Sequence, residues 1–299
     1  MKIGFSSLVC PAWDLSTIVE KASSLGFQGV EIRGLLGELH LPLLPQIAAR
    51  PDRVRNLFSE KNVELVCLGS SASLSSRNKR ENARQSSLIV EFMELASRLG
   101  CPFVRIFAGQ HERGDAPERA IARMADALRS LAAAASRLNV RLLVENGGDF
   151  SSSQAMWYLI DAVGHPAVQC CWNQCSAMAD LESPTLSIPR LGSKIGLAHI
   201  CDANVDEAGV LRDYKLPGEG TVGVVRQIEL LRGIGYRGYL MFEWPKLWVE
   251  SLSDAESVLP KVAGCLKACL DSRQTILSAY KGDKNAPRFV GSVAASTAG

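Results

Sequence analysis

The fold is decided by short apolar stretches such as Val140-Arg-Leu-Leu-Val-Glu-Asn146, which has the pattern of a buried strand that ends in polar residues. Apolar residues occupy both alternating sets of positions, as is typical of parallel strands covered on two faces. Seven other stretches share this pattern: Lys2–Ser6, Gly29–Arg33, Val63–Leu68, Phe103–Phe107, Val168–Trp172, Ile195–Ile200 and Gly238–Glu243. With Val140–Glu145, the chain therefore has eight candidate strands.

Segments with helical periodicity follow most of these strands. Asp14–Leu25 repeats apolar residues at helical spacing, and Asp14 and Gly26 are its candidate start and end signals. Pro117–Leu138 starts with proline at the first helical position. Its apolar stripe comprises Ile121, Met124, Ala125, Leu128, Leu131, Ala132, Ala135 and Leu138.

Two later helices are predicted from weaker signals. Thr221 precedes a stripe of Val225, Ile228 and Leu231, which Gly233 closes. Ser253 and Glu256 have the spacing of a capping box for the last helix. Pro260 lies inside that segment, where it either kinks the helix or marks its true start.

Eight strand–helix units in a chain of this length predict a (β/α)8 barrel, with an open doubly wound sheet as the alternative. The G-x-G-x-x-G stretch Gly218–Gly223 follows the polar segment 202–215 rather than a strand, so we interpret it as a turn that opens the Thr221 helix. We expect one barrel domain over residues 1–274. Residues 275–299 are rich in Lys, Gly, Ser and Ala, which predicts a disordered tail.

Composition excludes several classes of protein. The 299 residues are 47% hydrophobic and 21% charged, which excludes global disorder. A net charge of +2 argues against a nucleic-acid partner. No apolar run is long enough to span a membrane and no signal-peptide pattern is present, so we expect a cytoplasmic protein. The nine cysteines form no C-x-x-C motif and are interpreted as buried reduced thiols.

Polar residues follow four successive candidate strands. Glu145, Asn173, His199 and Glu243 each stand where a strand ends. Alone, each is more often a helix cap, a loop ion pair or a core histidine. Because adjacent parallel strands lie about 4.8 Å apart, four such residues at matching depth are expected to converge. Oxygen-rich ligands with one imidazole favour Mn²⁺, Mg²⁺, Co²⁺ or Fe²⁺.

The chain also resembles the xylose-isomerase-like TIM barrels, which include sugar isomerases and epimerases, inosose dehydratases, hydroxypyruvate isomerases and endonuclease IV. The resemblance extends from Met1 to about residue 270. It is carried by these ordered motifs: Lys2-Ile-Gly-Phe, Leu25-Gly-Phe-Gln-Gly-Val-Glu-Ile, Val144-Glu-Asn, Cys171-Trp-Asn, His199-Ile-Cys-Asp202, Leu216-Pro-Gly-Glu-Gly220 and Gly235-Tyr-Arg-Gly-Tyr-Leu-Met-Phe-Glu-Trp.

This resemblance implies a divalent metal held by Glu145, Asn173, His199 and Glu243, with the two glutamates also moving a substrate proton. The family usually has Trp-Asp-x-x-His where this chain has Trp172-Asn-Gln-Cys-Ser176. An amide therefore replaces a carboxylate ligand, which predicts a weakly bound metal. Since only neutral imidazole coordinates, metal affinity should fall below about pH 6.5, the ordinary histidine pKa.

Three functions follow from these residues. The first is a metal-dependent isomerase or epimerase of a keto-sugar or related polyol, and the same residues would also suit a dehydratase of a keto-cyclitol. The second is a sugar-binding barrel without turnover, suggested by Asn173 and Ser176. The third, a nuclease resembling endonuclease IV, is disfavoured because the chain has four histidines.

Other residues are candidates for substrate contact. Trp13 and Trp244 could stack on a sugar ring, and Glu31, Ser176, Glu219 and Lys246 could bind hydroxyl groups. The negative charge of Glu219 in the glycine-rich turn favours a substrate without phosphate. The identity of the substrate and the oligomeric state, a homo-oligomer included, stay open.

Overall fold

The computed structural model describes residues 1–110, 112 and 114–282, and for residues 272–282 the backbone alone. Eight parallel strands close into a barrel in the order β1-β10-β7-β6-β5-β4-β3-β2. The strands are β1 (Lys2–Ser6), β2 (Gly29–Ile32), β3 (Glu64–Ser73), β4 (Phe103–Phe107), β5 (Arg141–Glu145), β6 (Val168–Asn173), β7 (Ile195–Ile200) and β10 (Tyr239–Phe242). The predicted (β/α)8 barrel is confirmed, with β3 longer than expected.

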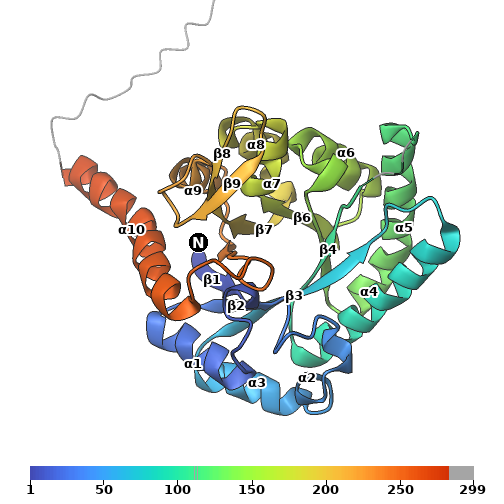
Figure 1. Ribbon diagram of the computed structural model, residues 1–299, viewed down its shortest axis with the longest axis horizontal. Helices are drawn as coiled ribbons and strands as arrows, with labels where there is room; N and C mark the ends of the chain where they lie inside the picture. Colours follow the sequence, from blue (N-terminus) through green and yellow to red (C-terminus); the bar gives the residue numbers. More distant parts are fainter. Residues whose placement is uncertain (111, 113, 283–299) are drawn as a thin grey trace, which may run out of the picture.

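Helices surround this barrel, as Figure 1 shows. They are α1 (Leu15–Leu25), α2 (Pro45–Ala48), α3 (Pro51–Glu60), α4 (Lys79–Leu99), α5 (Pro117–Arg137), α6 (Ser153–Val163), α7 (Gln174–Ala177), α8 (Pro184–Leu191), α9 (Val224–Gly233) and α10 (Ala255–Gly282). Apolar side chains of these helices pack on the outward face of the strands and form the main core. Burying one such leucine stabilises the fold by about 1.5–3 kcal/mol.

The predicted boundaries of α1 and α5 are confirmed. The Asp14 carboxylate accepts a hydrogen bond from the Thr17 backbone N–H at 2.8 Å, and Gly26 ends α1 in the left-handed conformation. Pro117 is the first residue of α5, and Met124 and Leu128 of its stripe are buried.

The predicted start of α9 is wrong. This helix begins at Val224 after Gly223, and Thr221 lies in the preceding loop, where its N–H and its hydroxyl both donate to the Ala203 carbonyl. Because the start shifts, Val224 is buried and Val225 is exposed.

The capping box predicted for the last helix is also wrong. α10 begins at Ala255, and the Glu256 carboxylate accepts a hydrogen bond from the Trp13 indole at 3.0 Å instead of reaching back to the helix start. Pro260 lies within α10 and does not mark its beginning. The helix continues past the expected domain boundary at residue 274 to Gly282. Most of the predicted tail, residues 283–299, lies outside the described residues.

An antiparallel hairpin occupies the segment that the sequence suggested to be a polar loop. It consists of β8 (Asp202–Val205) and β9 (Leu211–Lys215). The Asp206 carboxylate forms its turn by accepting hydrogen bonds from the N–H groups of Ala208 and Val210. The hairpin directly follows β7, so it lies at the carboxyl-terminal mouth of the barrel.

Asp202 fixes this hairpin to the glycine-rich turn that precedes α9. Its buried carboxylate accepts hydrogen bonds from the backbone N–H groups of Gly218, Gly220 and Val222 at 2.8, 3.1 and 3.3 Å. A Cβ at Gly220 would lie 2.3 Å from an Asp202 carboxylate oxygen and 2.6 Å from the Ala203 carbonyl oxygen. Glycine is therefore required for this close approach.

The interior of the barrel is apolar at its base and polar at its mouth. Inward side chains at the base include Phe103, Leu143, Cys171, Leu197 and Met241. Because side chains alternate between the two faces of a strand, the next inward positions are Arg105, Glu145, Asn173, His199 and Glu243. The strand register therefore places these polar groups together.

Seven of the nine cysteines are buried, as the sequence predicts. In the described part of the chain, no helix combines the length and the apolarity that crossing a bilayer requires.

Candidate active site

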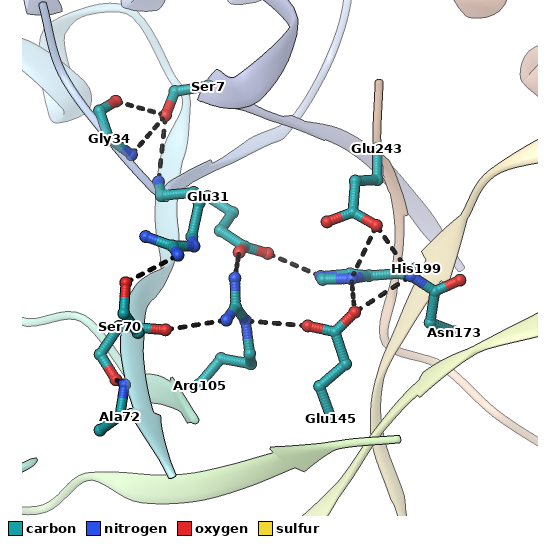
Figure 2. Close-up of polar contacts among 12 residues, drawn as sticks. Ser7, Glu31, Gly34, Ser70, Ala72, Arg105, Glu145, Asn173, His199 and Glu243 are labelled. Carbon is teal, nitrogen blue, oxygen red and sulfur yellow. Dashed lines mark hydrogen bonds and ion pairs between the residues drawn. The ribbon is translucent and has the colours of Figure 1, made fainter. Parts of the chain in front are cut away.

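His199 lies at the centre of a cluster of buried carboxylates at the barrel mouth. Its Nε2 lies 2.8 Å from Glu31 Oε2, and its Nδ1 lies 3.2 Å from Glu145 Oε1 and 3.7 Å from Glu243 Oε2. Figure 2 shows the three glutamates around the imidazole. The structure therefore brings Glu145, His199 and Glu243 together, and Glu31 contacts the other ring nitrogen of His199.

Arg105 is a further member of this cluster that the sequence analysis missed. It is fully buried on β4, with its Nε 3.0 Å from Glu145 Oε2 and its Nη2 3.6 Å from Glu31 Oε1. Its Nη1 donates to the Ser70 carbonyl at 2.9 Å. Figure 2 shows the guanidinium between the two glutamates, on the side away from Glu243. A charged residue inside the apolar run Phe103–Phe107 was the available signal.

These neighbours separate the pKa values of the two predicted proton-transfer glutamates. Burial would raise the pKa of Glu145, but His199 and Arg105 outweigh it and lower this pKa to about 2. Burial raises the pKa of Glu243 to about 7, with His199 opposing it and Glu145 and Glu31 adding to it. Glu145 is therefore a fixed anion, whereas Glu243 exchanges its proton near neutral pH.

His199 and Glu31 form a buried ion pair. Burial opposes the charge on the imidazole, but Cys171, Glu31 and Glu145 raise the pKa of His199 well above its ordinary value. The His199 cation likewise lowers the pKa of Glu31 against the effect of burial. In the metal-free protein these neighbours therefore favour the charged imidazolium over the neutral ring.

Asn173 faces the cluster and also caps a helix. Its Nδ2 donates to Glu145 Oε1 at 3.0 Å and to Glu243 Oε2 at 2.7 Å. Its Oδ1 accepts from the Cys175 N–H at 3.0 Å at the start of α7. The adjacent Asn146 fixes its backbone, accepting from the Asn173 N–H at 2.7 Å. Asn173 thus links the two glutamates through its amide N–H groups.

The residues at this point fit a divalent metal. Glu145 Oε1, Glu243 Oε2 and His199 Nδ1 lie around the Asn173 amide, with the separations given above. Metal–ligand bonds of 2.0–2.2 Å place neighbouring ligand atoms about 3 Å apart. Glu31 holds the opposite ring nitrogen of His199, which is the arrangement that orients metal-ligating histidines. Asn173 would coordinate after turning its amide oxygen inward.

Cys171 also lies near these groups. A ligand atom from each of Glu145, Cys171 and His199 lies within 4.8 Å of the others. Burial raises the pKa of the Cys171 thiol to about 12, so the free thiol is neutral. Oxygen and imidazole ligands therefore remain the more favourable set for a metal at this site.

A cavity of about 450 Å³ opens in front of this cluster. Glu145, Asn173, Ser176 and Glu243 line it, so four predicted site residues face the same space. Its other walls are mainly apolar, with Phe107, Tyr214 and Trp248 as the large side chains. The volume suits a small molecule.

The other predicted substrate contacts lie elsewhere. Trp244 is buried with its indole donating to the Ser253 carbonyl, and with Glu219 it lines a separate cavity of about 230 Å³. The Lys246 ammonium donates to the carbonyls of Glu250 and Leu252. Trp13 is half-buried and donates to Glu256. None of these four side chains lines the main cavity.

The sequence profile of the family described as xylose isomerase-like TIM barrel matches residues 19–269. The chain therefore belongs to the xylose isomerase-like TIM barrel family. No curated protein sequence matches it.

Solved structures share the fold at low sequence identity. The IOLI protein with a binding zinc atom has a TM-score of 0.80 at 18% identity, covering 91% of this chain and 99% of its own. L-ribulose 3-epimerase has a TM-score of 0.75 at 19% identity, covering 96% and 99%. D-psicose 3-epimerase with D-tagatose from Clostridium cellulolyticum H10 has a TM-score of 0.72 at 19% identity, covering 93% and 99%.

Proposed function

We propose that the protein is an isomerase or epimerase of a keto-sugar or related polyol, and that Glu145 and Glu243 move the proton next to the substrate carbonyl. The observation that carries the proposal is that both carboxylates face one small cavity at the barrel mouth. Two carboxylates on one cavity can remove a proton from a carbon and return one to the same or a neighbouring carbon. The similarity in fold to the sugar epimerases supports this assignment.

The two glutamates are held differently, which suits different roles. Glu145 is fixed on both oxygens, by Arg105 at Oε2 and by Asn173 at Oε1. Glu243 contacts Asn173 and His199 and is more exposed to the cavity. In the resting protein Glu145 is therefore an oriented, charged base, and Glu243 gains or loses its proton near neutral pH, so one can take a proton from a substrate carbon while the other returns one.

Glu145, Asn173, His199 and Glu243 would hold the divalent metal. When bound, such an ion would polarise a carbonyl and an adjacent hydroxyl and so acidify the neighbouring C–H bond. Ser176 on α7 lies on the cavity wall, where its hydroxyl can bind a sugar hydroxyl.

Deuterium exchange tests this function directly. The Mn²⁺-treated protein is incubated in D₂O with a panel of ketoses and keto-sugar acids, and deuterium at the carbon next to the carbonyl is measured by NMR. We expect exchange into at least one member of the panel, and its loss in Glu243→Gln. No exchange across the panel in metal-loaded protein would overturn the assignment and favour a sugar-binding barrel without turnover.

A further inference from the structure

Arg33 is a buried cation that the proposed reaction does not use. It follows β2 directly, and only 4% of its surface is exposed. Its Nη2 donates to the Ser71 hydroxyl at 2.9 Å. Its Nη1 is buried and has no hydrogen-bond partner among the described residues. Leaving a charged donor unpaired inside a protein is costly, so this group is expected to receive a partner in the working state.

The side chain of Arg33 borders the candidate active site. A Cβ at Gly69 on β3 would lie within 3.0 Å of three atoms, Arg33 Cδ, Glu31 Oε1 and Arg105 Nη2. The absence of a side chain at Gly69 therefore lets the stem of Arg33 pack against the buried network that holds Glu145 and His199.

Two aromatic rings of the cavity wall flank the guanidinium. Its central carbon lies 5.8 Å from the ring centroid of Phe107 and 5.8 Å from that of Trp248. Both rings line the cavity in front of Glu145 and Glu243. Trp248 is 53% exposed, so a ligand can displace its ring without opening the core. Arg33 itself does not line this cavity and lies beside the exposed Trp248 ring at its edge.

The charges of the site favour an anionic ligand. The carboxylates of Glu31, Glu145 and Glu243 outnumber the guanidiniums of Arg33 and Arg105 by one. With neutral His199 and a divalent ion, the site would carry one net positive charge. Arg105 is already paired with two glutamates, so Arg33 is the guanidinium with capacity for a ligand. A substrate with one carboxylate would cancel this charge.

We propose that Arg33 binds a carboxylate of the substrate, so that the substrate is a keto-sugar acid rather than a neutral ketose. This inference rests on the proposed function and specifies its substrate class. Guanidinium groups form paired hydrogen bonds with carboxylates, and such charge-assisted bonds are about twice as strong as neutral ones. Binding places the carboxylate at Nη1 in place of the Trp248 ring and leaves the carbonyl end facing Glu145 and Glu243.

The test compares two probes that differ in a single group. 5-Keto-D-gluconate carries a carboxylate where L-sorbose carries a hydroxymethyl group, and the rest of the two molecules is the same. Each probe is titrated into the Mn²⁺-loaded full-length protein in a calorimeter. The acid should bind at least about tenfold more tightly than L-sorbose, which is equivalent to about 1.4 kcal/mol. Because a carboxylate can also bind Mn²⁺ directly, the decisive quantity is the acid preference of wild type relative to Arg33→Met.

Arg33→Met keeps the apolar stem and should remove most of the preference, measured as the ratio of the affinity for the acid to the affinity for L-sorbose in the same variant. Arg33→Lys keeps a charge and should retain part of the preference. This variant provides the comparison if Arg33→Met does not fold. Arg129→Met changes an exposed arginine of α5 and should behave as wild type. Trp248 fluorescence should change on binding the acid, and Trp248→Phe should lose that signal.

Equal affinities of wild type for the two probes, or no measurable binding of the acid, would overturn the inference. An acid preference in Arg33→Met as large as that of wild type would also overturn it. The outcome is separate from that of the proposed function: an acid preference that depends on Arg33 without deuterium exchange supports the carboxylate site and contradicts the enzyme assignment. Deuterium exchange into neutral ketoses without an acid preference supports the enzyme assignment and contradicts the carboxylate site.

Discussion

At the scale of single residues, Asn173 stands where the resemblance to the family leads us to expect aspartate, and its amide makes the site less negative than an aspartate would. The sequence identified the position but left two orientations open, toward the site or toward the helix that follows. The structure combines them, because one atom of the amide caps α7 and the other links Glu145 and Glu243. A residue letter alone does not specify which end of an amide faces a neighbour.

Asn173→Asp should bind Mn²⁺ about tenfold tighter or more, because ligand charge strongly tunes metal affinity. Without metal, the new carboxylate would lie where the amide now lies, 3.0 and 2.7 Å from the oxygens of two other glutamates. The metal-free variant should therefore unfold at a lower temperature than wild type, and Mn²⁺ should reverse that order. Thermal unfolding with and without Mn²⁺ measures both effects.

The exposed Asn62→Asp substitution is the matched control for this charge change and should alter neither quantity. Equal Mn²⁺ affinities for wild type and Asn173→Asp would exclude position 173 from the metal's ligands.

Glu145→Gln and Glu243→Gln should each reduce turnover by at least about 10²-fold, the usual effect of removing a positioned acid or base. Each substitution keeps the volume and removes the proton-accepting charge. Steady-state rates on the substrate found by deuterium exchange provide the measurement, with the exposed Glu118→Gln on α5 as the control. Near-normal turnover in either site variant would exclude the two-glutamate mechanism.

The ion pairs of Arg105 could not be predicted from the sequence pattern. An arginine within an apolar strand is visible in the sequence, but its partners Glu31 and Glu145 come from other strands, and their pairing depends on barrel closure. Arg105→Met should destabilise the metal-free protein by about 3–5 kcal/mol, because it leaves buried carboxylates without their cation. Urea unfolding measures this loss, and a change below about 1 kcal/mol, the usual value of a surface pair, would contradict the buried network.

At the scale of elements, strands and long helices are well predicted and connections are not. Apart from the end of β3, the strand ends lie close to their predicted positions because buried parallel strands have continuous apolar runs. The hairpin β8–β9 escaped prediction because its sequence is polar and its pairing is set by contacts outside it. The start of α9 was misplaced for the same reason, since Thr221 bonds to Ala203 of that hairpin.

Asp202→Ala should loosen this connection. It removes the acceptor for the N–H groups of Gly218, Gly220 and Val222, and each buried donor left unpaired costs about 1–3 kcal/mol. Hydrogen exchange should become faster at these three amides than at the amides of α5. Unchanged protection of the turn would show that Asp202 does not hold it.

At the scale of the whole molecule, the closed barrel converts four sequence-distant strand ends into one site. The sequence predicted this convergence from strand order and depth, and Asn173 and His199 are indeed paired residues of β6 and β7. It could not predict the electrostatics, because the pKa values depend on burial and on Arg105. From the sequence, metal affinity was expected to decrease at pH values below the ordinary histidine pKa. Because the pKa of His199 is raised, we expect this decrease to begin at a higher pH.

The most direct test of the central claim, that these strand ends form one metal and proton-transfer site, is calorimetric titration of Mn²⁺ into metal-free protein at pH 7. Buffers with different ionisation enthalpies report the protons released. The surrounding carboxylates favour the protonated form of His199, about half of Glu243 is protonated at pH 7, and both groups must lose their protons to coordinate. We therefore expect one ion per chain, release of one to two protons, and affinity that rises with pH. Binding without proton release, or affinity that does not change with pH, would contradict His199 as a ligand and with it the proposed site.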